Sequence, residues 1–155
     1  MRAFSGTTTT HIDAAPKDVF AVVTDVDRLP NWNAAIERVE QRPERLEPGA
    51  EWIVRMHPSH MPSWGSASVV TELDADAGRF VYETRNTDGN PSRVTWSWQV
   101  DGDDDGSTVT VHWHCVLATP DRRFLAGPIR KRQLAREVPQ SLVALANVVS
   151  SSARR

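Results

Sequence analysis

The sequence predicts an α+β domain in which a curved, seven-stranded antiparallel sheet wraps around one long C-terminal helix. Three observations support this prediction. Apolar and polar residues alternate over much of the chain, short turn sequences separate the alternating runs, and a helical period replaces the alternation after about residue 121. Short loops join antiparallel neighbours, and an amphipathic helix has to bury its apolar stripe. We therefore expect the helix to lie on the inner face of the sheet.

The chain starts with a predicted strand, which two short helices follow. Residues 7–13, TTTTHID, are rich in β-branched types and predict the strand. Pro16 suits the first turn of a helix. An apolar stripe follows it at Val19, Phe20, Val22 and Val23. A second helical turn is expected over residues 27–32, ending near Trp32.

Six further strands are predicted after these helices, each bounded by a turn sequence. The breaks EPGA, HPSHMPS, DADAG, NTDGNP and DGDDDGS are dense in Gly, Pro, Asp or Asn. The predicted strands cover residues 35–42, 50–57, 64–74, 79–86, 92–101 and 107–118. Alternation is clearest in the last two strands. Their expected inward sets are Val94, Trp96, Trp98 and Val100, and Val109, Val111, Trp113, Cys115 and Leu117.

The C-terminal region predicts one long amphipathic helix. Its apolar stripe recurs at spacings of three and four, at Leu134, Val138, Leu142, Leu145 and Val149. Two prolines interrupt the pattern. We expect the body of the helix to start near residue 128 or 129 and to bend near Pro139, where the ring removes a backbone hydrogen bond.

Length and composition predict a single soluble domain over residues 1–155, with its core at about 7–150. The formal net charge of -2 gives no reason to expect nucleic acid as a partner. The sequence shows neither a signal peptide nor an apolar membrane span, so we expect a cytoplasmic protein. Sixteen arginines against two lysines are typical of a high-GC bacterial genome. The oligomeric state is left open.

The stretch VHWHC, residues 111–115, is the strongest candidate for a metal site, because imidazole and thiol groups bind zinc and copper. On a strand, His112 and His114 share one face, whereas Cys115 points to the other face. A trio of His11, His112 and His114 on the outer face is conceivable. No carboxylate or second cysteine completes a tetrahedral shell, so we expect no metal and no other cofactor.

A partial calcium motif lies in DGDDDGSTVTVH. Asp101, Asp103, Asp105 and Gly106 fit the first half of an EF-hand loop, but the twelfth position is His112 and the flanks are strands. We interpret the segment as an acidic hairpin turn.

The stretch HIDAAPKDVFAVVTDVDRLPNWN resembles the N-terminal signature of the START-like, or SRPBCC, superfamily. The similarity is to its polyketide cyclase/dehydrase-like group, which has the Bet v 1 helix-grip fold, and the order of elements matches over about residues 7–150. The resemblance implies an elongated cavity between the sheet and the helix that binds apolar or amphipathic small molecules. It also implies a structural role for Trp32, which follows the Pro-x-Trp pattern of the group.

Aromatic and apolar residues on the predicted strands and helix are the candidates for the lining of this cavity. They are Trp52, Met56, Trp64, Phe80, Tyr82, Trp96, Trp98, Trp113, Leu134 and Val138. Core filling is the alternative for the tryptophans. Residues 57–64, HPSHMPSW, either contact ligand at the cavity mouth or form an ordinary connection.

A basic cluster near the start of the long helix either holds an acidic headgroup or a carrier-protein phosphopantetheine, or forms a solvated face. It consists of Arg122, Arg123, Arg130, Lys131, Arg132 and Arg136.

The sequence favours binding of a hydrophobic or polycyclic molecule, such as a lipid, a polyketide or a quinone-like compound. The alternative is an enzyme similar to polyketide aromatase/cyclases, with Tyr82, Arg55 and Arg85 as candidates for orientation or acid/base work. No motif identifies a catalytic nucleophile or carboxylate pair. A protein-interaction module is the third possibility. Polar groups inside the cavity would favour the enzyme, and a wholly apolar lining would favour the carrier.

Overall fold

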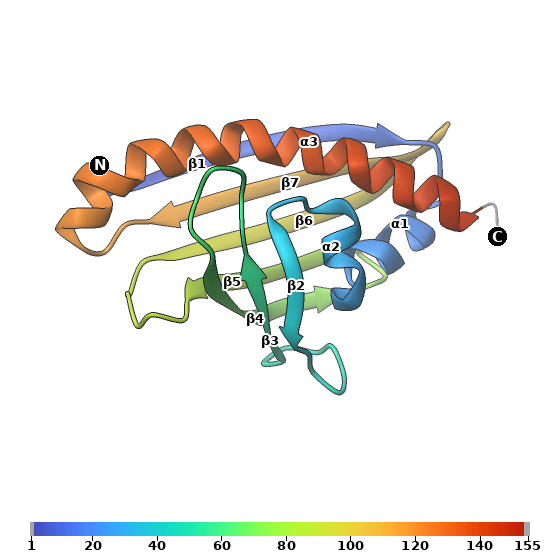
Figure 1. Cartoon of the computed structure of the whole chain (residues 1–155). Helices are drawn as coiled ribbons and strands as arrows, with labels where there is room; N and C mark the ends of the chain where they lie inside the picture. Colours follow the sequence, from blue (N-terminus) through green and yellow to red (C-terminus); the bar gives the residue numbers. More distant parts are fainter. Residues whose placement is uncertain (1, 154–155) are drawn as a thin grey trace.

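The computed structural model describes residues 2–153 and contains one antiparallel sheet with helices on one face (Figure 1). The seven strands lie in the order β1-β7-β6-β5-β4-β3-β2, and the predicted α+β fold class is confirmed. The strands are β1 (Ala3–Ile12), β2 (Ile36–Gln41), β3 (Glu51–Met56), β4 (Trp64–Asp74), β5 (Arg79–Asn86), β6 (Arg93–Asp103) and β7 (Gly106–Val116). The helices are α1 (Pro16–Val23), η1 (Val26–Arg28), α2 (Leu29–Trp32), η2 (Arg122–Ala126) and α3 (Gly127–Ala153). None of these described helices is long and apolar enough to cross a membrane.

Two boundaries differ from the sequence-based expectation. The first strand starts at Ala3 rather than residue 7, because Ala3–Gly6 pair with the end of β7, Phe4 lying opposite Cys115. The long helix begins at Gly127 and follows the five-residue π-helical turn η2. Pro139 does not end the helix, and its ring lies on the exposed side.

The apolar stripe of α3 is buried, as its spacing predicts. Leu142 and Leu145 are 1% and 0% exposed, and fully burying a leucine contributes roughly 2 kcal/mol. In Figure 1 the helix runs alongside β1, and α3 contacts β1, α1 and α2. The helix therefore covers the β1 side of the sheet more closely than the β3 side.

A glycine on β1 makes room for the Trp113 ring. Gly6 lies opposite Trp113 in the β1–β7 pair, and a Cβ atom at Gly6 would lie 2.1 Å from the Trp113 ring. Any larger side chain would displace the indole, so the sequence needs glycine there for steric reasons.

Candidate functional site

A cavity of about 80 Å³ lies between the inner face of the sheet, α2 and α3. Alternation along β3–β6 aims every second side chain into it, and five aromatic residues contribute half of its apolar lining residues. Its lining consists of Leu29, Trp32, Asn33, Ile36, Trp52, Val54, Met56, Ser66, Ser68, Tyr82, Thr84, Trp96, Trp98, Arg130, Val138 and Ser141. The wall is therefore mixed, with hydroxyl, amide and guanidinium groups among the rings.

Two neighbouring cavities share wall residues with the first. One, of about 120 Å³, extends toward η2 and is lined by Trp64, Cys115, Arg122 and Ala126 among others. Another, of about 40 Å³, lies under α3 beside Leu134 and Glu137. Arg130 lines all three cavities, so its side chain stands at their junction.

Arg130 reaches the interior because it lies four residues before Leu134 and eight before Val138, on the same side of α3. Its Nη1 donates a hydrogen bond to Oε1 of Gln133 at 3.0 Å. Its Cζ lies 5.8 Å from the centre of the Trp64 ring. Among residues 2–153 no carboxylate forms an ion pair with Arg130. Its guanidinium therefore remains free to bind an anionic or carbonyl oxygen.

The electrostatics of Arg130 agree with this geometry. Burial lowers the pKa of Arg130, and the charge of Glu137 partly opposes that change. Glu137 also accepts hydrogen bonds from Nε2 of the buried Gln133 at 3.3 Å. Arginine stays protonated in proteins, so the cavity contains a partly desolvated positive charge that is hydrogen-bonded to a neutral amide.

Tyr82 projects from β5 into the first cavity. Its hydroxyl oxygen accepts a hydrogen bond from Nε1 of Trp98 at 3.4 Å, which leaves the hydroxyl proton free to donate. Burial raises the pKa of Tyr82 to about 12, although the Trp98 hydrogen bond acts in the opposite direction. At neutral pH the group is an uncharged donor and not a base.

Trp32 supplies a third donor. It ends α2, and its ring meets the Trp98 ring edge to face, with centroids 5.5 Å apart. Nε1 of Trp32 is buried and has no hydrogen-bond partner among the described residues. A buried unsatisfied donor costs about 1–3 kcal/mol, and a ligand oxygen in the adjacent cavity would offset that cost.

The structure brings most of the predicted lining residues together. Those on the wall of the first cavity are Trp52, Met56, Tyr82, Trp96, Trp98 and Val138. Trp64 lines the second cavity and Leu134 the third. Phe80 and Trp113 line none of the three and instead belong to the core, Phe80 stacked behind Trp52 and Trp113 against Trp96.

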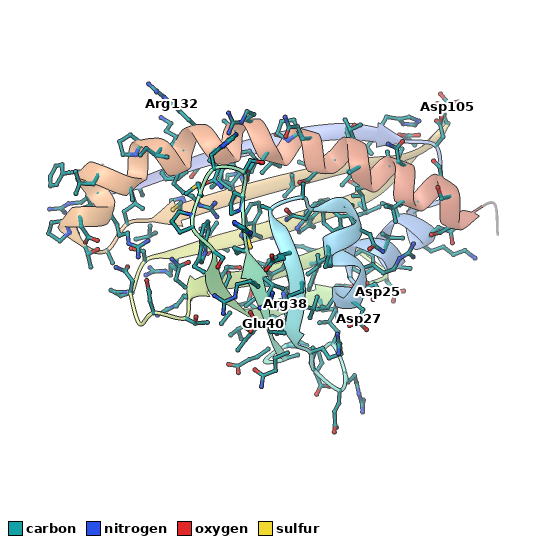
Figure 2. The ribbon with its side chains drawn as sticks, viewed as in Figure 1. Asp25, Asp27, Arg38, Glu40, Asp105 and Arg132 are labelled. Carbon is teal, nitrogen blue, oxygen red and sulfur yellow. The ribbon has the colours of Figure 1, made fainter. Side chains whose placement is uncertain are left out.

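The two arginines that the sequence predicted to act beside Tyr82, Arg55 and Arg85, lie outside the cavity. Arg55 and Arg85 point to the outer face, where they donate to Glu40 and Glu83 at 2.7 and 2.8 Å. Their expected role inside the cavity is therefore wrong, because alternation places them opposite the inward residues of β3 and β5. Figure 2 shows Glu40 and Arg38 on β2, at the end of the sheet away from β1.

The histidines do not converge. His112 and His114 lie on the outer face, where their Nδ1 atoms contact Oγ1 of Thr7 at 2.7 Å and Oγ of Ser5 at 2.6 Å. His11 lies opposite Thr108, four residues along from His112, which is about 13 Å on a strand. The described residues contain no group of three potential metal ligands. The trio of His11, His112 and His114 is thus not assembled.

The acidic segment DGDDDGS, residues 101–107, forms the predicted hairpin turn between β6 and β7, where Asp103 lies opposite Gly106. Oδ2 of Asp103 accepts hydrogen bonds from Thr108 and His11 at 2.8 and 2.9 Å. Asp105 projects from the tip of this hairpin in Figure 2.

The β3–β4 loop and the basic cluster each have some residues that line a cavity and others that are exposed to solvent. Pro58 and Ser59 of the loop line a further cavity of about 120 Å³ beside Glu137. Within the basic cluster Arg130 turns inward, whereas Lys131, Arg132 and Arg136 are exposed. This separation was not predicted from the sequence, although the four-residue spacing between Arg130 and Leu134 was a signal for it.

A seven-stranded sheet that holds one long helix over an aromatic-lined cavity defines a protein of the helix-grip class. The chain belongs to the family described as polyketide cyclase / dehydrase and lipid transport, which matches residues 3–150. The resemblance at the N-terminus is thereby confirmed. No curated protein matches the chain in sequence.

Solved structures share the fold at low identity. The di-domain ARO/CYC StfQ from the steffimycin biosynthetic pathway aligns with a TM-score of 0.79 and 14% identity, over 99% of this chain and 53% of that chain. This chain thus spans about half of StfQ. Ara h 8.0201 aligns with a TM-score of 0.68 and 17% identity, over 96% of this chain and 99% of that chain. TTHA0849 from Thermus thermophilus aligns with a TM-score of 0.72 and 16% identity, over 97% and 98% of the two chains. At these identities the likeness concerns the fold alone.

Proposed function

We propose that this protein binds a hydrophobic, aromatic or polycyclic small molecule that carries oxygen acceptors, in the cavity between the sheet and α3. The observation that supports this most strongly is the presence of three donors around one aromatic-lined cavity. They are the unpartnered Nε1 of Trp32, the hydroxyl of Tyr82 and the guanidinium of Arg130. Quinone-like and polyketide-like molecules combine flat apolar rings with carbonyl oxygens and fit this chemistry.

Apolar burial supplies most of the affinity in such a site, at roughly 25 cal/mol per Å² removed from water. The three donors set the orientation of the ligand. Ligands of drug size occupy pockets of about 300–1,000 Å³, whereas the first two cavities measure about 80 and 120 Å³. We infer that the ligand joins them when the Arg130 side chain, which lines both cavities, moves aside and turns its guanidinium from the Gln133 amide to a ligand oxygen.

An aromatase/cyclase-type enzyme is the second candidate, and the polar groups on the cavity wall favour it over a simple carrier. Tyr82 would donate to a ketone oxygen, and Arg130 would stabilise the negative charge of an enolate. Among residues 2–153, Glu137 is the one carboxylate on the walls of these cavities, so it is the candidate proton acceptor. A cyclase forms a carbon–carbon bond by aldol addition and then releases one water.

Two fluorescent probes that differ by one anionic group test the binding proposal. Anilinonaphthalene sulfonate is anionic, and its parent phenylnaphthylamine is neutral. Arg130→Met should weaken sulfonate binding by about tenfold to a hundredfold, since a hydrogen bond to a charged group is worth about 1.5–3 kcal/mol. Binding of phenylnaphthylamine should change by less than about twofold.

Arg132→Met is the matched control, because Arg132 lies two residues away on the exposed side of α3. It should leave both affinities unchanged. Equal sulfonate binding by wild type and Arg130→Met would refute the assignment of Arg130, and failure of both probes to bind would refute the cavity proposal.

Native mass spectrometry of the freshly purified protein distinguishes the carrier hypothesis from the enzyme hypothesis. A bound organic molecule that is released unchanged after incubation supports a carrier. Conversion of an added linear polyketone to a product lighter by one water, lost in Glu137→Gln, supports the cyclase.

A further inference from the structure

Three large apolar side chains are exposed together where the chain enters α3. Phe124 and Leu125 are each 73% exposed and Ile129 is 60% exposed. We call these three residues the apolar tip. Two of them belong to the turn η2 and the third to the first turn of α3, so they lie at one end of the elongated molecule (Figure 1). Large exposed apolar clusters on a soluble domain mark interaction surfaces.

Positive charge surrounds the apolar tip. From Arg122 to Arg136 the chain has six basic residues and no acidic one. Two carboxylates next to this segment form ion pairs, and both pair with Arg122. They are Asp88 at 2.9 Å and Asp121 at 3.6 Å.

The exposed cations of this segment are Lys131, Arg132 and Arg136, and no carboxylate of residues 2–153 lies within 4.0 Å of their charged groups. Arg132 and Arg136 lie three and seven residues after Ile129, on the side of α3 away from the sheet. Figure 2 shows Arg132 projecting outward from that side. The surface next to the tip is therefore cationic and solvent-facing.

We propose that the apolar tip docks end-on to an anionic lipid bilayer. Phe124, Leu125 and Ile129 would enter the interface, and Arg132 and Arg136 would contact lipid phosphates. An exposed cluster of aromatic and aliphatic side chains beside unpaired arginines matches the chemistry of interfacial binding segments. A fluid bilayer accepts such side chains directly, whereas a protein partner would need a complementary pocket for them.

The same segment also forms the wall of the second cavity. Ala126 and Arg130 line that cavity, while the neighbouring Leu125 and Ile129 face outward. Docking at the tip would place this cavity against the bilayer. The docking inference does not depend on the proposed function, and its test uses lipid vesicles without a cavity ligand.

The test uses one labelled cysteine at a time. The only native thiol, Cys115, is buried and 3% exposed, so Leu125→Cys can be labelled selectively with an environment-sensitive nitrobenzoxadiazole dye. Val143→Cys is the matched control, because Val143 is 63% exposed on α3 but lies about 20 Å further along the helix than Ile129, the last residue of the apolar tip. Each protein is mixed with vesicles of pure phosphatidylcholine or of equimolar phosphatidylcholine and phosphatidylglycerol.

We expect a blue-shifted, brighter emission only for the label at residue 125 and only with the anionic vesicles. Replacing Arg132 or Arg136 by Gln should lower vesicle partitioning by about fivefold each. The unlabelled triple variant Phe124→Ser, Leu125→Ser, Ile129→Ser should not sediment with vesicles.

Several results would overturn the proposal. They are the absence of binding to anionic vesicles, equal binding of the triple variant, or an equal emission change at residue 143. A protein that does not bind vesicles could instead bind an acidic protein through the apolar tip, or dimerise in analytical ultracentrifugation. Either result would assign the apolar tip to a protein partner and would also overturn the proposal.

Discussion

Tyr82 is the only tyrosine in the chain, so its ionisation can be followed without interference from another phenol. Burial raises its pKa from 10.0 to about 12. The folded protein therefore holds the phenolic proton more tightly than the unfolded chain does. Between pH 10 and pH 12 unfolding releases this proton, so stability falls as the pH rises through that range. Below pH 10 the contribution of this group is fully present.

The magnitude follows from the same pKa. Each tenfold change in proton affinity is worth about 1.4 kcal/mol, so the rise in the pKa of Tyr82 corresponds to a loss of up to about 2.7 kcal/mol of folding free energy above pH 12. In Tyr82→Phe this loss is absent. The variant forfeits only the long 3.4 Å hydrogen bond from Trp98, which contributes less than about 1 kcal/mol.

Two measurements check this prediction. The ultraviolet absorbance of phenolate should appear near pH 12 in the folded protein and near pH 10 in urea. Urea unfolding at increasing pH should show wild type losing stability faster than Tyr82→Phe. A native protein whose phenolate appears at pH 10 would refute the reasoning, because the hydroxyl would then be solvated and not a cavity donor.

Two further predictions concern β1. Gly6→Ala should lower the free energy of unfolding by about 1–3 kcal/mol in urea titrations, because the new Cβ overlaps the buried Trp113 ring; unchanged stability would contradict the packing described. His11 contacts Asp13 and Asp103 at 2.7 and 2.9 Å, and these hydrogen bonds raise its pKa. In nuclear magnetic resonance titrations its ring should therefore titrate above pH 6.5, and Asp13→Asn should move the titration back down; a ring indifferent to that change would rule out the contact.

The order of the elements could be predicted because side-chain periodicity is a local property. Alternation places Trp98 and Val100 on the inner face of β6, and both are buried. The spacing of Leu134, Leu142 and Leu145 defines the buried stripe of α3 in the same way. The start of β1 was missed because residues 3–6 carry no strong strand signal and are held by pairing with a strand more than a hundred residues later.

The candidate site was only partly predictable. Alternation assigns the tryptophans to the inner face, but it cannot say where space remains between sheet and helix. Trp113 is buried against Trp96 and over Gly6 of β1, on the side of the sheet that α3 contacts, whereas Trp96 and Trp98 line the first cavity. The position of the helix decides which of these rings fill the core and which form a wall.

The sequence by itself determined the fold class, the inward face of each strand and the buried stripe of the helix, since these depend on residues two, three or four positions apart. Only the tertiary structure decided that Arg130 separates from its basic neighbours and enters the cavity, and that Nε1 of Trp32 is buried without a partner in the described part of the chain. Both results depend on the distance between α2, α3 and the sheet. That distance is set by the packing of side chains far apart in the chain, such as Trp113 against Gly6.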